Sequence, residues 1–234
     1  MNEDYGYGVS SVEKVATNVN KVMRLVYVKM LLAMLVTAVT SMYVTSNETL
    51  LMLIYGKPMV FVGLLISQVI VVISLLGRLQ KMSTITASLL FYLYSVLTGV
   101  VFASILLVYT ATSIANTFFI TAGVFGAMSV YGYFTSNDLS KMGSLLIMGF
   151  LGLIICSVVN IFLKSQPMEW LISFVGVLVF IGLTAWDTQK IKAAAAHAEG
   201  DDVKRLATIG ALELYLDFVN LFIYLLRFFG NDRK

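Results

Sequence analysis

Few residues of this sequence are of the kinds that build disulfides, metal centres or catalytic surfaces. Its 234 residues include one cysteine, one histidine and two prolines, and only 12% are charged. The lone Cys156 cannot form an intrachain disulfide, and one histidine without a Cys-x-x-Cys pair leaves too few ligands for a transition metal. The net charge of +3 is small and the basic residues form no cluster, which excludes a nucleic-acid surface. We therefore expect no cofactor and no nucleic-acid partner.

Apolar residues make up 59% of the chain. Soluble domains carry about 25% charged residues, roughly twice the fraction found here. A chain so poor in charge cannot cover itself with a water-soluble surface. The composition therefore predicts an integral membrane protein whose surroundings are membrane lipids.

Seven apolar runs are long enough to cross a bilayer, which takes about 20 helical residues. They cover residues 25–44, 58–76, 84–109, 113–134, 143–163, 168–187 and 205–229. Pro58 and Pro167 stand at the starts of two runs, where a missing backbone N–H does least harm. The sequence predicts an all-α membrane protein: a cytoplasmic polar tail over residues 1–24, then a single seven-helix transmembrane domain over residues 25–234.

The positive charges predict an orientation in the membrane. Of the 16 Lys and Arg residues, ten fall on the side of the N-terminus and five on the other side. Cytoplasmic loops carry the excess of positive charge, so we expect the N-terminus in the cytoplasm and the C-terminus outside. The remaining basic residue, Lys29, lies one turn inside the first run, and we expect it to reach back to the inner interface.

The last run, ALELYLDFVNLFIYLLRFF, carries Glu213 and Asp217. A carboxylate in hydrocarbon is costly, so such residues mark functional sites. Asp187 stands near the end of the preceding run. If the two helices form a hairpin that turns near residues 200–202, positions 187 and 217 are equally far from the turn. The hairpin therefore predicts that Asp187 and Asp217 face each other.

Polar residues continue along the last run at helical spacing. They are Glu213, Asp217, Asn220, Tyr224 and Arg227, one stripe on an otherwise apolar helix. The stripe indicates either the lining of a pathway or a set of hydrogen bonds that hold helices together. For Asn220 and Tyr224 we favour the second reading.

Two facing carboxylates share a proton, because both cannot be ionised cheaply at close range, and they titrate as a pair. Once deprotonated, their oxygens are hard ligands of the kind that calcium prefers. Asp187, Asp217 and Glu213 are therefore candidate calcium ligands, and the pair is a candidate pH sensor. Arg78, at the inner end of the second run, is either a counter-charge for this pair or an ordinary interface anchor.

Two sequence blocks carry a family resemblance. AWDTQKIK and ELYLDFVNLFIYLLRFFG resemble, in this order, the end of the sixth helix and the last helix of the transmembrane Bax inhibitor motif family. The seven-span layout, the polar tail and GRLQKMS after the second span extend the resemblance over most of the chain. Trp186, where the family commonly has tyrosine, and Glu213, where a small polar residue is usual, depart from its pattern.

The resemblance implies a seven-helix bundle with the last helix central and the function of a pH-sensitive calcium leak channel. It implies that Asp187 and Asp217 are the proton-sharing pair that gates the channel, and that Arg78 engages the first aspartate in the closed state. Glu213 and Asn220 would line the pathway, and the partners would be lipids, calcium ions and protons. A bacterial inner (plasma) membrane would be the location.

Other functions were weighed against this one. An intramembrane aspartyl protease would need Gly-x-Gly-Asp, whereas Leu214, Tyr215 and Leu216 precede Asp217, so we expect no enzyme. Two alternatives stay open: a proton-coupled transporter, and a non-conducting protein that binds and modulates a membrane protease or another partner.

Overall fold

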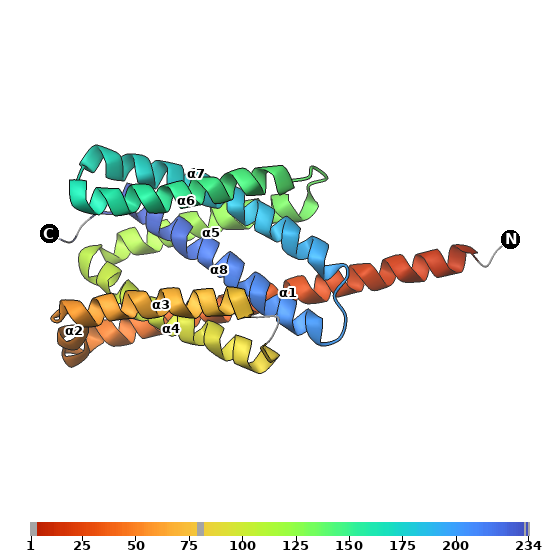
Figure 1. Ribbon diagram of the computed structural model, residues 1–234, viewed down its shortest axis with the longest axis horizontal. Coiled ribbons are helices and arrows are strands. Elements are labelled where there is room, and N and C mark those ends of the chain that lie inside the picture. The colour runs from red at the N-terminus through yellow and green to blue at the C-terminus, as the bar shows by residue number, and fades with distance from the viewer. Residues whose placement is uncertain (1–3, 79–81, 232, 234) are drawn as a thin grey trace. The chain divides into compact units, whose positions relative to one another are not determined.

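The computed structural model describes residues 4–78, 82–231 and 233, and the secondary structure of that part of the chain is helical. Its elements are α1 (Asp4–Ser46), α2 (Glu48–Tyr55), α3 (Pro58–Arg78), α4 (Thr84–Val108), α5 (Ala111–Phe134), α6 (Ser140–Leu163), α7 (Gln166–Ala195) and α8 (Asp201–Phe229) (Figure 1). Within the described residues, seven helices are long and apolar enough to cross a membrane. The predicted all-α class and the seven spans are confirmed.

Two segments outside the predicted spans are helical. Helix α1 begins at Asp4 and includes most of the segment predicted to be a polar tail, and no proline interrupts the chain before Pro58. The first connection, expected to be a loop, contains the helix α2. The side chain of Asn47 starts it by accepting a hydrogen bond from the backbone N–H of Leu50 (3.2 Å).

Local chemistry sets the turn between α7 and α8. Helix α7 continues past residue 187, where the predicted sixth span stops, and ends at Ala195. His197 and Ala198 close short i→i−3 hydrogen bonds, which tighten the last turn, and Gly200 adopts a left-handed backbone (φ +57°) that reverses the chain. Asp201 and Asp202 occupy the first turn of α8, as predicted, where negative charge suits the helix dipole.

The chain forms two compact units, and α4, α7 and α8 contribute residues to both. The first unit consists of Met1–Ala103 and Ile191–Leu212. Within it, α2 packs against α1 and α3. The Tyr55 hydroxyl of α2 donates a hydrogen bond to the carbonyl of Val100 (2.6 Å), which fixes α2 to α4.

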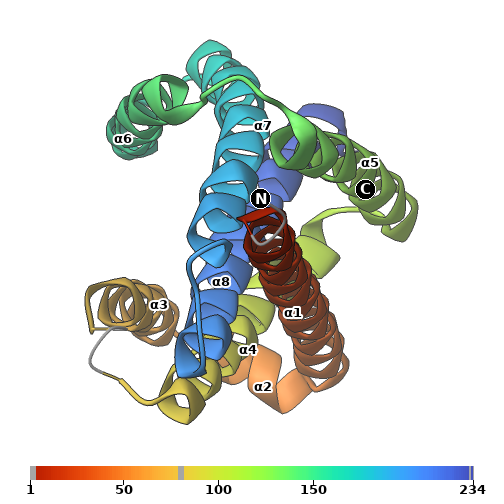
Figure 2. The same ribbon diagram turned by 90° about the vertical axis from the view of Figure 1, so that its right-hand side faces the viewer.

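The second unit consists of Ser104–Lys190 and Glu213–Lys234 and holds most of the predicted site residues. Within it, α7 lies between α5 and α6 (Figure 2). Gly132 of α5 lies directly against the backbone of Ala185, and Gly143 of α6 lies against the Trp186 ring. These glycines let the helices approach so closely that no side chain fits between them.

Helix α8 is the most buried of the seven candidate spans. In its most apolar window 67% of residues are buried, compared with 6% for α3 and α6. A helix whose surface is largely covered by protein can carry polar groups that lipid would not tolerate. This burial agrees with the predicted central place of the last helix.

The contact between α5 and α7 generates a test. In Gly132→Ala the new Cβ would meet the Ala185 carbonyl, which is backbone and cannot move aside. We expect a loss of about 1–3 kcal/mol of stability, seen as a lower melting temperature in detergent. The matched control is Gly123→Ala on the same helix, where a Cβ meets no atom within 4 Å. The control should be neutral or slightly stabilised, because alanine favours helix. Equal melting temperatures for the two variants would contradict this packing.

Candidate functional site

A cluster of charged side chains joins α7 to α8 inside the second unit. Asp187 and Lys190 come from α7, and Glu213 and Asp217 from α8. Asp187 and Asp217 are buried, with 7% and 4% of their surfaces exposed. We call these four residues the charge cluster.

Lys190 is the cation of the cluster and bridges the two helices. Its Nζ lies 2.7 Å from Asp187 Oδ1 and 2.8 Å from Glu213 Oε1, and it donates a hydrogen bond to each. The ammonium also lies 4.8 Å from the ring centre of Trp186, within the range of a cation–π contact. One side chain thus compensates two carboxylates from two helices.

Asp217 is the fourth residue of the charge cluster. Its carboxyl group lies within hydrogen-bond reach of that of Asp187. Two carboxyl groups so close together can share one proton. The second oxygen, Oδ2, is buried and has no hydrogen-bond partner among the described residues. The arrangement predicted from the hairpin, Asp187 facing Asp217, is the one that the structure has.

Lys190 is the site residue that sequence reasoning missed. The sequence assigned it to the loop after the sixth span, but α7 continues past it to Ala195. The signal was present, since positions 190 and 213 lie about the same midpoint, near residue 202, as positions 187 and 217. The hairpin argument that paired the aspartates therefore also pairs Lys190 with Glu213.

Gln189, the last residue of the Asp-Thr-Gln block, fixes the end of α7 to the loop before α6. Its amide donates to the Asn137 carbonyl (2.8 Å) and accepts from the backbone N–H of Leu139 (2.9 Å). In the same loop the pKa of Asp138 lies below its usual value, because the hydroxyl and the backbone N–H of Ser140 donate hydrogen bonds to the carboxylate. The Asp-Thr-Gln block thus supplies Asp187 to the charge cluster and Gln189 to the hydrogen bonds that hold the loop before α6.

Comparison with known proteins decides the family. The family model described as "Inhibitor of apoptosis-promoting Bax1" matches residues 19–234. The chain belongs to this family.

Relatives within this Bax inhibitor family cover nearly the whole chain. "Inner membrane protein YbhL" of Escherichia coli strain K12 is 46% identical over 211 residues, 89% of this chain and 90% of its own length. An uncharacterised protein of Borreliella burgdorferi is 46% identical over 217 residues, 92% of this chain and 94% of its own. A protein of Deinococcus radiodurans is 35% identical over 222 residues, 94% of each chain. The predicted family and the predicted integral membrane protein are confirmed.

Other residues singled out by the Bax inhibitor resemblance have different outcomes. Arg78 is the last residue of α3, and its side chain lies outside the described part of the structure, so its role stays a prediction. Asn220 donates to the carbonyl of Leu216 on its own helix (2.8 Å). Tyr224 stacks on Phe180 and hydrogen-bonds to Ser157. Tyr224 thus contacts α6 and α7, whereas the Asn220 hydrogen bond stays within α8.

The candidate calcium ligands of this Bax inhibitor family member lie close together, but an ammonium stands between two of them. Among the described residues, no group of three or more His, Cys, Asp or Glu side chains is arranged to hold a metal ion. The Lys190 ammonium lies between Asp187 and Glu213. Assignment of Asp187, Asp217 and Glu213 as calcium ligands therefore stays a prediction that requires Lys190 to move.

Lys29, in the first unit, has two hydroxyl partners. Its Nζ donates to the hydroxyls of Ser88 on α4 (2.7 Å) and Thr208 on α8 (2.9 Å). Two hydroxyl acceptors inside the unit hold the ammonium there, a pairing that the sequence alone did not indicate.

Removal of the Lys190 charge tests the charge cluster. Lys190→Met leaves three carboxylates without their ammonium, and we expect the free energy of unfolding to fall by about 1–3 kcal/mol. Breaking a fully buried ion pair costs about 3–5 kcal/mol. The expected loss is smaller here because the Lys190 side chain is 40% exposed. The measurement is the melting temperature in detergent at several pH values. The deficit should be largest at alkaline pH and shrink at acid pH, where protons replace the missing cation.

The matched control for Lys190→Met is Arg205→Met. Arg205 also pairs with an aspartate three residues away on its helix, Asp202 (3.2 Å), but that carboxylate side chain is 70% exposed. An exposed pair contributes about 0–1 kcal/mol, so this variant should stay close to the wild type at every pH. A Lys190→Met deficit that is equally small would show that the cluster does not depend on its cation.

Proposed function

We propose that the protein is a calcium leak channel whose conductance is set by protonation of the Asp187–Asp217 pair. The observation that carries the proposal is the charge cluster itself. One ammonium joins Asp187 to Glu213 across two candidate membrane spans, and the buried carboxyl groups of Asp187 and Asp217 lie within hydrogen-bond reach of each other. Ionisable groups at such positions mark ion and proton pathways.

Charge balance supports a divalent ion. With one shared proton, the three carboxylates and Lys190 carry a net charge of about −1; without the proton the net charge is about −2. A buried excess of two negative charges requires a counter-ion, and one calcium ion supplies the matching charge through the oxygen ligands that it prefers. Loss of the proton thus favours calcium at the same place, and calcium and proton compete.

Lys190 would act in this scheme as a tethered cation that occupies the ion's place. Its side chain is 40% exposed, so the ammonium has access to solvent when it leaves Asp187 and Glu213. Long lysine side chains can place their charge in water while the stem stays against apolar surface. Movement of this one side chain would free the two carboxylates for a permeant ion.

The location belongs to the same proposal. The excess of Lys and Arg on one side places the N-terminus in the cytoplasm and the C-terminus outside. The relative from Escherichia coli is named an inner membrane protein, and we place this chain in a bacterial inner (plasma) membrane by that similarity. No catalysis is proposed for it.

Calcium flux into proteoliposomes tests the gate. The purified protein is reconstituted with a calcium-sensitive dye inside, and influx is followed at pH values from about 5 to 9 for the wild type, Asp187→Asn and Asp217→Asn. We expect wild-type influx to depend on pH and either variant to lose that dependence, because an asparagine neither shares nor releases the proton.

The matched control is Asp138→Asn, the same chemical change in the exposed loop before α6. The Ser140 hydrogen bonds keep the pKa of Asp138 low, so its carboxylate stays ionised over the whole range and should add nothing to the pH profile. Influx no faster than in empty liposomes at every pH would refute the channel. It would favour a proton-coupled transporter or a protein that modulates a membrane partner.

A further inference from the structure

A second polar site lies at the other end of α8, within the second unit and apart from the charge cluster. It is a pocket of about 390 Å³ between the last turns of α6, the first turns of α7 and the last turn of α8. Because these are the ends of three candidate membrane spans, the pocket lies at a membrane surface. No residue of the pocket belongs to the charge cluster.

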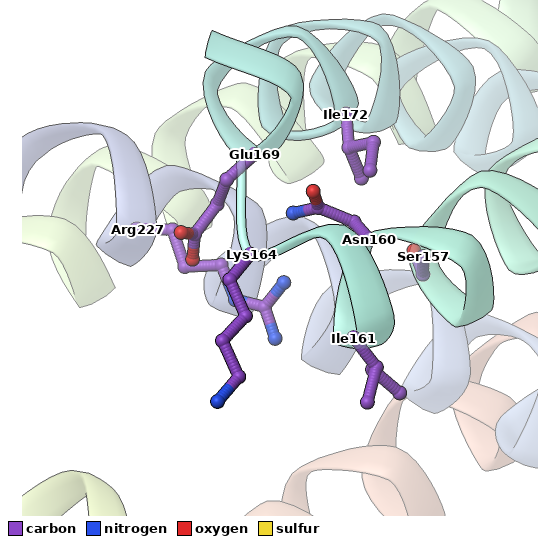
Figure 3. Close-up of a pocket in the computed structure, with 7 residues that line it drawn as sticks. All are labelled: Ser157, Asn160, Ile161, Lys164, Glu169, Ile172 and Arg227. Carbon is purple, nitrogen blue, oxygen red and sulfur yellow. The ribbon is translucent and has the colours of Figure 1, made fainter. Parts of the chain in front are cut away.

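The pocket combines two cations with one carboxylate. Lys164, Arg227 and Glu169 line one side of it, and Asn160, Ile161 and Ile172 line the other (Figure 3). Within the described part of the chain, no salt bridge of Lys164, Arg227 or Glu169 is found. Three charges that face one pocket without pairing leave it able to receive both an anionic and a cationic group.

The backbone of Lys164 adds an independent observation. This residue ends α6 in the left-handed conformation (φ 49°), and among the described residues it is the only non-glycine with positive φ. Helix ends in this conformation usually have glycine or asparagine, because other side chains are strained there. A role of the Lys164 charge in binding would explain a lysine at this position, since backbone strain of this kind is common at binding sites.

The surface beside the pocket is apolar and open. Ile161, Phe162 and Leu163, in the last turn of α6, are 68%, 82% and 62% exposed, and Trp170 on α7 is 56% exposed. An exposed tryptophan at the end of a span is typical of the level of lipid headgroups. The pocket therefore opens where a headgroup would meet its acyl chains.

We propose that this pocket binds the headgroup of an amine-bearing phospholipid, with the phosphate between Lys164 and Arg227 and the ammonium at Glu169. A guanidinium and an ammonium are the groups that bind phosphate in proteins, and a carboxylate is the natural partner of a primary amine. The acyl chains would lie along the exposed residues at the end of α6. The proposal is independent of calcium conduction.

Native mass spectrometry of the full chain in detergent tests this. Phosphatidylethanolamine and phosphatidylglycerol with identical acyl chains are added in turn, and soluble glycerophosphoethanolamine is added separately. We expect the ethanolamine lipid to bind better than the glycerol lipid. Lys164→Gly and Arg227→Met should each weaken lipid binding about tenfold, and Glu169→Gln should turn the preference toward the glycerol lipid, which has no amine.

Two controls distinguish a loss of lipid binding from a loss of folding. Lys164→Gly relieves the left-handed strain, so its melting temperature in detergent without added lipid should equal or exceed the wild-type value while lipid binding falls. The control Lys57→Met removes an exposed lysine next to the start of α3, outside the pocket, and should bind like the wild type. Equal lipid binding in Lys164→Gly and the wild type, or no change of preference in Glu169→Gln, would overturn the proposal. Binding of the soluble headgroup as tight as that of the lipid would assign the pocket to a free phosphate ester instead.

Discussion

The need to compensate three carboxylates inside a membrane protein constrains the structure of α7 and α8. Each buried charge must have a partner, or the helices that carry it cannot pack. Helix α7 must therefore continue one turn past Asp187, because only there does Lys190 reach both Asp187 and Glu213. The register of the hairpin is fixed by the same requirement, since a shift along the helix axis would separate the ammonium from one carboxylate.

The sequence could predict the parts of this arrangement that follow from periodicity. Hydrophobic runs located the seven spans, and distance from the turn paired Asp187 with Asp217, because an antiparallel helix pair has one register once its turn is known. Sequence could not decide where α7 ends, since the alanine-rich stretch favours helix and gives no stop signal before Gly200. That choice determined whether Lys190 was a loop charge or a site residue.

Sequence also could not predict the partners of a side chain that has two physically reasonable environments. Lys29 could reach water or find acceptors inside the protein, and the hydroxyls of Ser88 and Thr208, distant in sequence, settle the choice. Helix α2 is a case in which a local signal was present. Asn47 followed by Glu48 is an ordinary helix start. The segment is too short to cross a membrane, so the sequence indicated only a connection between spans. Local sequence signals can predict that a helix exists, whereas the residues that it contacts depend on the fold of the whole chain.

The polar stripe of α8 does not form one continuous lining in this conformation. Between Asp217 and Arg227, a rise of about 15 Å along the helix, Asn220 bonds to its own backbone and Tyr224 is held by Phe180 and Ser157. Gly176 leaves room for the Tyr224 ring, since a Cβ there would lie 2.7 Å from ring atoms. If the proposed channel runs along this face, Tyr224 would have to be displaced for a hydrated path to form. The proton on the carboxylate pair and the position of this tyrosine would then have to change together for an ion to pass.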